Sequence, residues 1–235
     1  MKLEKDILGE ITDVLRKRWT RRTGYTIPDE NSIRNGNDAV EIEGSVLYAD
    51  LAKSSELVHT YKDEFVARIY KSFLCAVCDV IRNNEGEITA FDGDRVMAVF
   101  IGSSKNTCAA RTALQIAGIV RCLNNEIGNY FPSTDYRIHF GVGVDTSKLF
   151  VVKTGIRKYN DLAWIGDAAN IAAKLSNIRG RGASVFITGR VFKAMNDSSR
   201  YNSQTEKRSM WSQTQLEMLG QQVYESNWYW NTPNK

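Results

Sequence analysis

Two aspartates, Asp92 and Asp94, lie in the middle of the largely apolar segment 87–100, EITAFDGDRVMAVF. Asp92 with Gly93 predicts the tight two-residue turn of a β-hairpin, because glycine accepts the positive φ that such a turn needs. A hairpin does not need the second acid, and two carboxylates this close repel each other unless a cation or solvent compensates them. Because Asp is common in turns, the hairpin taken alone is interpreted as a solvated turn.

A third aspartate, Asp50, ends the apolar segment 46–49 and precedes the polar segment 52–55, after which a helix is expected. Backbone N–H groups at a helix start are free to bind phosphate. Asp50 and Asp94 each lie at the end of a predicted buried strand and could share a pair of divalent cations. Mg²⁺ and Mn²⁺ take carboxylate and phosphate oxygens, and two such ions can stabilise an in-line displacement at phosphorus.

The composition is that of a globular protein with one substantial core: 235 residues, 43% hydrophobic and 25% charged. The net charge of +4 fits a polyanionic ligand and does not require a nucleic acid. With no apolar run of membrane length and no secretory signal, we expect a cytoplasmic protein with no membrane or nucleic-acid partner. Cys75 and Cys78 form a C-x-x-C in an apolar helical pattern without a nearby His, and we interpret them as core packing.

The elements that must position the acids follow from hydrophobic periodicity. The first half of the chain predicts an amphipathic helix over 3–19, a polar linker loop over 21–38, a strand over 40–49, a helix over 56–82, the hairpin over 87–100 and a helix over 104–127. The N-terminal helix could pack on its own domain or on a second copy of the chain, and a one-sided apolar stripe does not distinguish these alternatives.

The second half completes the pattern. It predicts strands over 136–144 and 149–153 joined by a turn at 145–148, a basic loop over 153–161, a helix from 166 to about 178, a short strand over 184–188, a short helix over 191–195 and a closing strand over 223–230. The order β-α-β-β-α-β is that of a ferredoxin-like core. We therefore expect an α+β fold with extra C-terminal strands and helices, an N-terminal helix and linker at 1–39, and a single domain at 40–235.

The helix that begins near Asp167 carries Asn170 and Lys174 four residues apart. Both side chains therefore project from one face and can reach the same ligand. The same spacing also fits a solvated pair on an exposed stripe, opposite a buried side made by Ile171 and Leu175.

In these features the chain resembles the catalytic domain of class III nucleotidyl cyclases over residues 40–230. Four segments match the family's motifs in order: 48–51 (YADL), 93–100 (GDRVMAVF), the strand pair at 137–153 and the segment 166–174. The resemblance implies that Asp50 and Asp94 hold two metal ions, Mn²⁺ or Mg²⁺, with the backbone carbonyl of Leu51 as a further ligand. It also implies a homodimer with sites at the interface, where Asn170 holds the ribose and Lys174 neutralises charge at phosphorus.

The chain departs from the family's pattern at the positions that read the base. The family's usual Arg is Lys174 here, which can neutralise charge but lacks the planar guanidinium fork. Adenylate cyclases carry Lys, and guanylate cyclases Glu, where this chain has Ala90. The other selector aligns with Ala163, and Asp161 could take its place because the preceding loop is one residue longer. Without these hydrogen-bonding selectors, a changed base preference is expected.

This pattern, with a compact chain and a first loop rich in Lys and Ser, is similar to the pyrimidine cyclases of bacterial Pycsar antiphage systems. The resemblance implies conversion of UTP, or next CTP, to the 3′,5′-cyclic monophosphate and pyrophosphate, with the product activating a downstream effector. It further implies that Ser54, Ser55 and the loop amides bind the triphosphate. Arg157, Lys158 and Lys207 are further phosphate-binding candidates that also fit a solvated surface.

Three other functions also fit parts of the sequence. A diguanylate cyclase would carry Gly-Gly-Asp/Glu-Glu-Phe at its turn, whereas residues 92–96 read Asp-Gly-Asp-Arg-Val. A purine cyclase with unusual base selectors stays open. So does a non-catalytic nucleotide-sensing dimer, although the presence of Asp50, Asp94 and Asn170 weighs against it.

Overall fold

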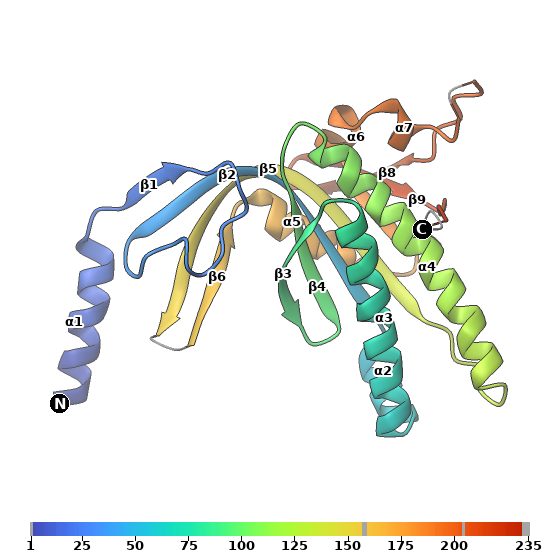
Figure 1. Cartoon of the computed structure of the whole chain (residues 1–235), viewed down its shortest axis with the longest axis horizontal. Coiled ribbons are helices and arrows are strands. Elements are labelled where there is room, and N and C mark those ends of the chain that lie inside the picture. The colour runs from blue at the N-terminus through green and yellow to red at the C-terminus, as the bar shows by residue number, and fades with distance from the viewer. Residues whose placement is uncertain (1, 157–158, 204, 232–235) are drawn as a thin grey trace.

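A computed structural model describes residues 2–156, 159–203 and 205–231 (Figure 1). One sheet runs through the molecule in the order β3-β4-β2-β5-β7-β9-β8, with β1 paired to β2 and β6 paired to β5. The strands are β1 (Thr20–Thr23), β2 (Asp38–Ala52), β3 (Glu87–Asp92), β4 (Arg95–Phe100), β5 (His139–Ile156), β6 (Tyr159–Ile165), β7 (Val185–Thr188), β8 (Ser212–Met218) and β9 (Gln221–Ser226). The helices are α1 (Lys2–Arg16), α2 (Ser54–Thr60), α3 (Asp63–Asn83), α4 (Lys105–Tyr130), α5 (Asp167–Ser176), α6 (Gly189–Ala194) and α7 (Asp197–Arg200).

The central part of the sheet has the predicted ferredoxin-like arrangement. β3, β4, β2 and β5 are neighbours in that order, and α3 and α4 connect them in the sequence β-α-β-β-α-β. β5 then pairs in parallel with β7, and β9 and β8 extend the sheet. The predicted α+β fold with additional C-terminal strands and helices is therefore confirmed.

Two apolar cores lie on opposite faces of β2, because side chains alternate between the faces of a strand. Leu47, Ala49 and Leu51 belong to the larger core, which α3 and α4 cover. Val46 and Tyr48 pack on the other face, in a second core that includes residues of α5. Figure 1 shows α3 and α4 running along the arched sheet. By the same alternation, the side chain at position 50 belongs on the face of α5.

One predicted turn was wrong, because β5 is a single strand from His139 to Ile156 that passes through the polar segment 145–148. Its pairing with β2 runs without a break from Val152 opposite Ala39 to His139 opposite Ala52. The polar side chains of this segment find partners on neighbouring elements: Thr146 Oγ1, for example, donates to the carbonyl oxygen of Gly44 on β2 at 3.2 Å. Pairing with distant segments here overrides local turn propensity.

Several other boundaries also differ from the prediction. In the predicted loop 153–161, residues 153–156 belong to β5 and residues 159–161 to β6, which pair in antiparallel, so position 161 lies on a strand; positions 157 and 158 lie outside the described residues. The helix predicted at 56–82 is divided into α2 and α3, because Tyr61 and Lys62 have extended backbones. The predicted linker begins with β1, which pairs in parallel with β2. The closing strand β9 ends at Ser226.

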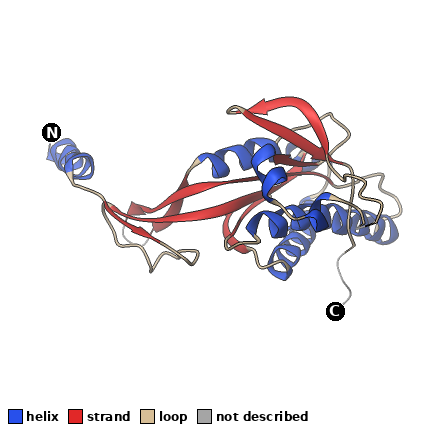
Figure 2. Cartoon of the chain, turned by 90° about the horizontal axis from the view of Figure 1, so that it is seen from above, coloured by secondary structure: helices blue, strands red, loops and turns tan. Residues whose placement is uncertain are grey.

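The N-terminal helix α1 projects away from the rest of the chain (Figures 1 and 2). Its large apolar side chains are exposed: Leu3, Ile7, Leu8, Ile11, Val14 and Leu15. The side-chain amide of Asn37 donates to the carbonyl oxygens of Val14 at 2.9 Å and Lys17 at 2.6 Å, which fastens the C-terminal end of the helix. The sequence left open whether this helix packs on its own domain or on a second copy of the chain. In the structure, its apolar side chains do not pack on its own domain.

Within the described ranges, no helix combines the length and apolar character needed to cross a bilayer. Cys78 lies in the larger core, whereas Cys75 is exposed, and both are free thiols. The core-packing interpretation therefore holds for Cys78 and was wrong for Cys75.

The close approach of α5 to β5 depends on Gly143, where an added Cβ would lie 2.2 Å from the carbonyl oxygen of Ala172 and 2.6 Å from Leu175 Cβ. We predict that Gly143→Ala lowers the free energy of unfolding by about 2–3 kcal/mol, since the helix backbone would have to shift. Urea unfolding measures the change. Gly9→Ala is the control, because an added Cβ there meets nothing within 4 Å; equal stability of both variants would contradict the close packing.

Candidate active site

Asp50 lies near the end of β2, directly opposite Arg95 of β4 in the antiparallel register. Opposed residues project from the same face, and Arg95 Nε lies 3.2 Å from Asp50 Oδ1. A second guanidinium comes from Arg179, just beyond the end of α5, whose Nη2 lies 2.8 Å from Asp50 Oδ2. Each carboxylate oxygen of Asp50 therefore accepts a hydrogen bond from a different arginine.

The two arginines are themselves held by the C-terminal end of α5. Arg95 Nη2 donates to Asn177 Oδ1 at 2.9 Å. Arg179 Nη1 donates to the backbone carbonyl oxygens of Ser176 and Ile178. These contacts join β2, β4 and the end of α5 around one carboxylate.

Asp94 lies in the turn between β3 and β4. The two turn residues are Gly93 and Asp94, one position later than predicted, because Asp92 pairs with Arg95. Gly93 has a φ of 60°, the positive value that a glycine at the first position of a hairpin turn accepts. The backbone N–H of Leu51 lies 3.4 Å from the carbonyl oxygen of Asp94, so the turn is adjacent to the end of β2.

The side chain of Asp94 fits a cation ligand. Its Oδ2 is buried and has no hydrogen-bond partner among the described residues. A buried carboxylate oxygen without a partner is costly, and a bound cation would compensate it. The described ranges contain no cluster of three or more His, Cys, Asp or Glu side chains that could hold a metal ion. A divalent ion here would therefore rely on two carboxylates, the Leu51 carbonyl and oxygens of a phosphate ligand.

Asn170 and Lys174 lie on the exposed face of α5, as their spacing predicts. Asn170 Nδ2 donates to the carbonyl oxygen of Gly166 at 3.4 Å. Across the described ranges, no hydrogen bond or ion pair joins either side chain to Asp50 or Asp94; the partners of Asp50 are the two arginines. One copy of the chain therefore presents the acidic residues and the α5 pair as separate groups.

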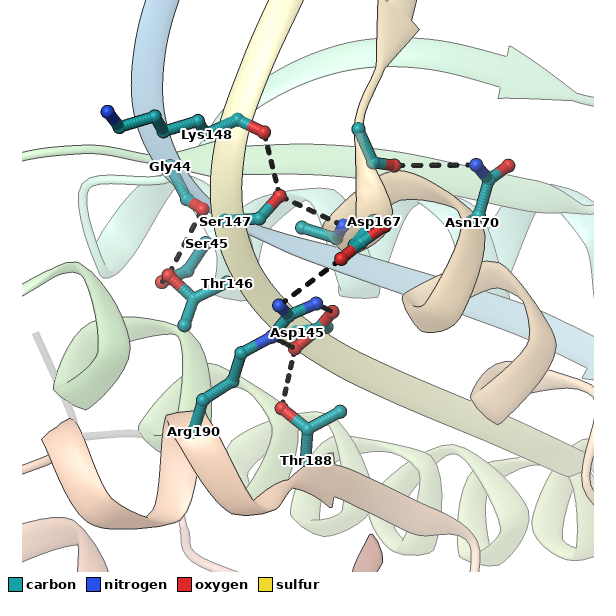
Figure 3. A network of polar contacts seen from close by, with 12 residues as sticks. Gly44, Ser45, Asp145, Thr146, Ser147, Lys148, Asp167, Asn170, Thr188 and Arg190 are labelled. Atoms are coloured by element: carbon teal, nitrogen blue, oxygen red, sulfur yellow. Dashed lines mark hydrogen bonds and ion pairs between the residues drawn. The ribbon is translucent and has the colours of Figure 1, made fainter. Parts of the chain in front are cut away.

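A buried ion pair lies at the N-terminal end of α5 (Figure 3). Asp145 on β5 is fully buried, and its Oδ1 accepts hydrogen bonds from Arg190 Nε at 2.7 Å and Thr188 Oγ1 at 2.5 Å. The hydrogen bonding of the Arg190 guanidinium to the Asp145 carboxylate, which accepts, is the main cause of the raised pKa of Arg190. Arg190 Nη1 also lies 3.5 Å from Asp167 Oδ2, at the first residue of α5.

A second contact fixes the same end of the helix. Ser147 Oγ accepts a hydrogen bond from the backbone N–H of Ala168 at 3.0 Å and donates to the carbonyl oxygen of Lys148 (Figure 3). The helix that carries Asn170 is thus fastened to β5 by Ser147 and, through Arg190, to α6.

The positions predicted to read the base lie on different strands. Ala90 on β3 is half-buried against the second core, beside an irregularity in the pairing of β3 with β4. Ala163 and Asp161 lie on β6, opposite Val152 and Thr154 of β5. In the sheet, β4, β2 and β5 separate β3 from β6. Pairing between neighbouring strands therefore does not bring Ala90 and Ala163 together.

Ser54 and Ser55 are the first two residues of α2, which begins two positions earlier than the predicted helix start at 56. The preceding Lys53 has a left-handed backbone with a φ of 60°, and no side chain caps this end of the helix. Arg157 and Lys158 lie outside the described residues. Lys207 pairs with Asp197 at 3.3 Å, so it has a surface ion-pair partner of its own.

Two cavities lie toward opposite ends of β2. One, of about 190 Å³, is next to α2, and Lys53, Tyr136 and His139 are among its lining residues. The pKa of Tyr136 is raised to about 12, mainly by burial, with Asp94 among the groups that add to the shift. A larger cavity, of about 510 Å³, opens at residues 41–43. Among the described residues, neither cavity is lined by a predicted site residue, but the smaller one is lined by Ala52 and Lys53, which lie between Leu51 and Ser54 in the sequence.

Sequence reasoning missed Arg95, Arg179, Asp145 and Arg190. The position of Arg95, opposite Asp50 on paired strands, follows from the hairpin once the pairing of β4 with β2 is known. The other contacts give no local signal, since Arg179 and Asp50 are 129 positions apart and Arg190 and Asp145 are 45 positions apart.

Comparison with known proteins places these features in a wider group. No protein-family model matches the chain. The chain is 40% identical over 233 residues to a uridylate cyclase of Burkholderia cepacia, covering 98% of this chain and 99% of that protein. It is 38% identical to a uridylate cyclase of Xanthomonas perforans, with the same coverage of 98% and 99%.

Solved structures of nucleotidyl cyclases share the fold. The adenylyl cyclase CyaB from P. aeruginosa matches with a TM-score of 0.67 and 17% identity, over 80% of this chain and 95% of that chain. A dimeric guanylyl cyclase domain of the RhoGC fusion protein from Blastocladiella emersonii matches with a TM-score of 0.61 and 12% identity, over 80% and 97% of the two chains. At these identities the comparison concerns the fold alone, which is that of the class III cyclases.

We predict that Arg190→Met lowers the free energy of unfolding by about 3–5 kcal/mol, because Asp145 would remain buried without its cation. The double variant Asp145→Asn/Arg190→Met removes both charges and should recover a large part of this loss. Denaturant unfolding of the two variants and the original protein measures both effects. A double variant as unstable as the single one would show that the ion pair is not the cause.

Proposed function

Because the chain belongs to the family of bacterial uridylate cyclases, we propose that it converts UTP to 3′,5′-cyclic UMP and pyrophosphate. The observation that carries the proposal is the similarity to proteins of that name over 98% of the chain. The geometry agrees with it, since the turn containing Asp94 lies beside the end of β2 that carries Asp50 and Leu51.

In this reaction the ribose 3′-oxygen loses its proton and forms a bond to the α-phosphorus, while the bond to the bridging oxygen breaks and pyrophosphate leaves. Two divalent ions, Mn²⁺ or Mg²⁺, would supply charge stabilisation at the attacking and leaving oxygens. Asp50, Asp94 and the Leu51 carbonyl are proposed to hold them. The buried Oδ2 of Asp94, which has no hydrogen-bond partner in the described part of the chain, supports this assignment.

The exposed pair on α5 is proposed to act on the ribose and the α-phosphate. The Asn170 amide can both donate to and accept from ribose oxygens, which would orient the 3′-hydroxyl. Lys174, one turn later, can neutralise the charge that develops at phosphorus. Ser54, Ser55 and the uncapped N–H groups at the start of α2 are proposed to bind the triphosphate, with Arg157 as a further phosphate ligand.

The sites are proposed to form between two copies of the chain. Asn170 and Lys174 are exposed and make no described contact with the two aspartates of their own copy, which leaves them available to a partner. The similar fungal guanylyl cyclase domain forms a dimer of a non-canonical kind, and this ability of the fold to dimerise also supports a homodimer here. In such a dimer, Asn170 and Lys174 of one subunit would complete the site that Asp50 and Asp94 of the other begin.

The preference for a pyrimidine is proposed to follow from the two alanines at the family's base-reading positions. Ala90 and Ala163 cannot donate or accept side-chain hydrogen bonds, so a purine would lack its usual partners there. Asp161 has an exposed carboxylate on the same strand as Ala163. We further propose that the cyclic product acts in the cytoplasm as a signal that activates a downstream effector during defence against phage.

A panel of four nucleotides tests the activity and the base together. The purified protein is incubated with Mn²⁺ and ATP, GTP, CTP or UTP, and products are identified by chromatography and mass. We expect cyclic UMP from UTP, at least about 100-fold faster than any cyclic purine nucleotide. Cyclic CMP as the main product would support a pyrimidine cyclase but contradict UTP as its preferred substrate. Cyclic AMP or cyclic GMP alone would contradict the pyrimidine assignment, and no product from any nucleotide would favour a sensing role.

Two variants test the metal-binding aspartates. We expect Asp50→Ala and Asp94→Ala to fold but to lose at least about 100-fold in turnover, the effect typical of removing a key electrostatic group. Circular dichroism and size-exclusion chromatography control for folding. Substantial turnover by either folded variant would contradict the assignment.

Mixing variants tests whether the site is shared between subunits. After subunit exchange, Asp94→Ala and Asn170→Ala proteins should together regain about a quarter of the original activity, because half of the dimers are heterodimers with one intact site. Each variant alone should be inactive. Exchanged, well-folded mixtures that stay inactive would indicate that each subunit contains a complete site.

A further inference from the structure

Two guanidinium groups form ion pairs with Asp50, whose carboxylate is a proposed metal ligand. Arg95 and Arg179 each take one oxygen of Asp50, whose side chain is 10% exposed. In a site with little water, contacts between unlike charges are strong, and the loss of one partner is costly. The arginines therefore stabilise the buried carboxylate in the chain as it stands.

A divalent cation on Asp50 would compete with both arginines. Binding at either carboxylate oxygen would bring two positive charges close to a guanidinium that touches the same group, where like charges repel. The cation would also have to replace hydrogen bonds that Asp50 already accepts. The arginine contacts therefore weaken metal binding at Asp50, and a bound metal ion weakens the arginine contacts.

The two arginines differ in their freedom to leave. Arg95 lies within the β2–β4 pairing, its side chain is 25% exposed, and it also donates to Asn177. Arg179 follows the last turn of α5, and its side chain is 37% exposed. Its other described contacts are with two backbone carbonyls, of Ser176 and Ile178, within three positions in the chain. Arg179 can thus release Asp50 by rotating its own side chain, without breaking the sheet.

We propose that Arg179 is a positioning residue that acts as a latch on Asp50. In the metal-free chain it holds the carboxylate and opposes metal binding, and a bound metal ion displaces it. The inference rests on the proposed role of Asp50 as a metal ligand and adds a residue that sets the affinity of the site. Its consequence is that removal of this positive side chain tightens metal binding, whereas removal of an ordinary supporting residue would weaken it.

Mn²⁺ binding without nucleotide tests the latch independently of activity. The free Mn²⁺ signal in electron paramagnetic resonance is followed while the full chain is titrated. Arg179→Gln should lower the Kd about fivefold, which corresponds to about 1 kcal/mol. Arg179→Lys should give an intermediate Kd, because lysine keeps the charge but lacks the guanidinium fork.

Arg181→Gln is the matched control. It removes the same charge two positions further along, from a side chain that is 35% exposed and pairs with Glu225 at 2.8 Å. Because Arg181 does not contact Asp50, the Kd of this variant should equal that of the original protein. If Arg181→Gln changed the Kd as much as Arg179→Gln does, the loss of net charge alone would explain the effect, and the latch would be overturned.

Asp50→Asn separates this inference from the proposed function. If Asp50 is a ligand, this variant should bind Mn²⁺ at least about tenfold more weakly. An unchanged Kd would overturn the metal site and the latch with it. If Asp50→Asn binds Mn²⁺ more weakly while the Kd of Arg179→Gln is unchanged or raised, the metal site stands and only the latch is overturned. Should Arg179→Gln fail to fold, the Lys variant decides, since a Kd no lower than that of the original protein contradicts the latch.

Discussion

The buried charge of Asp50 is the constraint on which the site depends. A carboxylate removed from water must be compensated, and here a strand neighbour and a residue beyond α5 compensate it. The second contact requires α5 to lie directly on β5. At Gly141, an added Cβ would lie 2.1 Å from the carbonyl oxygen of Ser176 and 2.6 Å from Arg179 Nη1. The absence of a side chain at Gly141 therefore leaves the space in which Arg179 reaches the carboxylate of Asp50.

Aspartate–arginine contacts fasten α5 at both ends. At its start, Arg190 joins Asp167 to the fully buried Asp145, and at its end Arg179 joins Asp50. These contacts set the position of the helix that carries the proposed ribose and phosphate ligands. If a metal ion releases the contact at the end, the contact at the start remains. The helix can thus keep its place while the metal site changes partners.

The sequence predicts the fold well, because strands and helices have local signals. Strand alternation places Asp50 near the end of β2, and the glycine of segment 92–94 predicts the turn that contains Asp94, one position away from its observed place. The polar segment 145–148 predicts a turn by its composition, whereas it lies within a strand whose polar partners, such as Thr188 and Arg190, are distant in the chain. The break between α2 and α3 was also missed, since the apolar stripe continues through Tyr61. The contact of Arg179 with Asp50 also has no local signal, because it depends on tertiary packing between residues 129 positions apart.

One carboxylate is thus proposed to bind arginines and metal ions in turn. A crystal structure of the protein with Mn²⁺ and 3′-deoxy-UTP tests this exchange, with anomalous diffraction collected to locate manganese. We expect manganese peaks between Asp50 and Asp94, with Arg179 turned away from Asp50. Manganese located elsewhere, or manganese at Asp50 with Arg179 still hydrogen-bonded to the same oxygen, would contradict it.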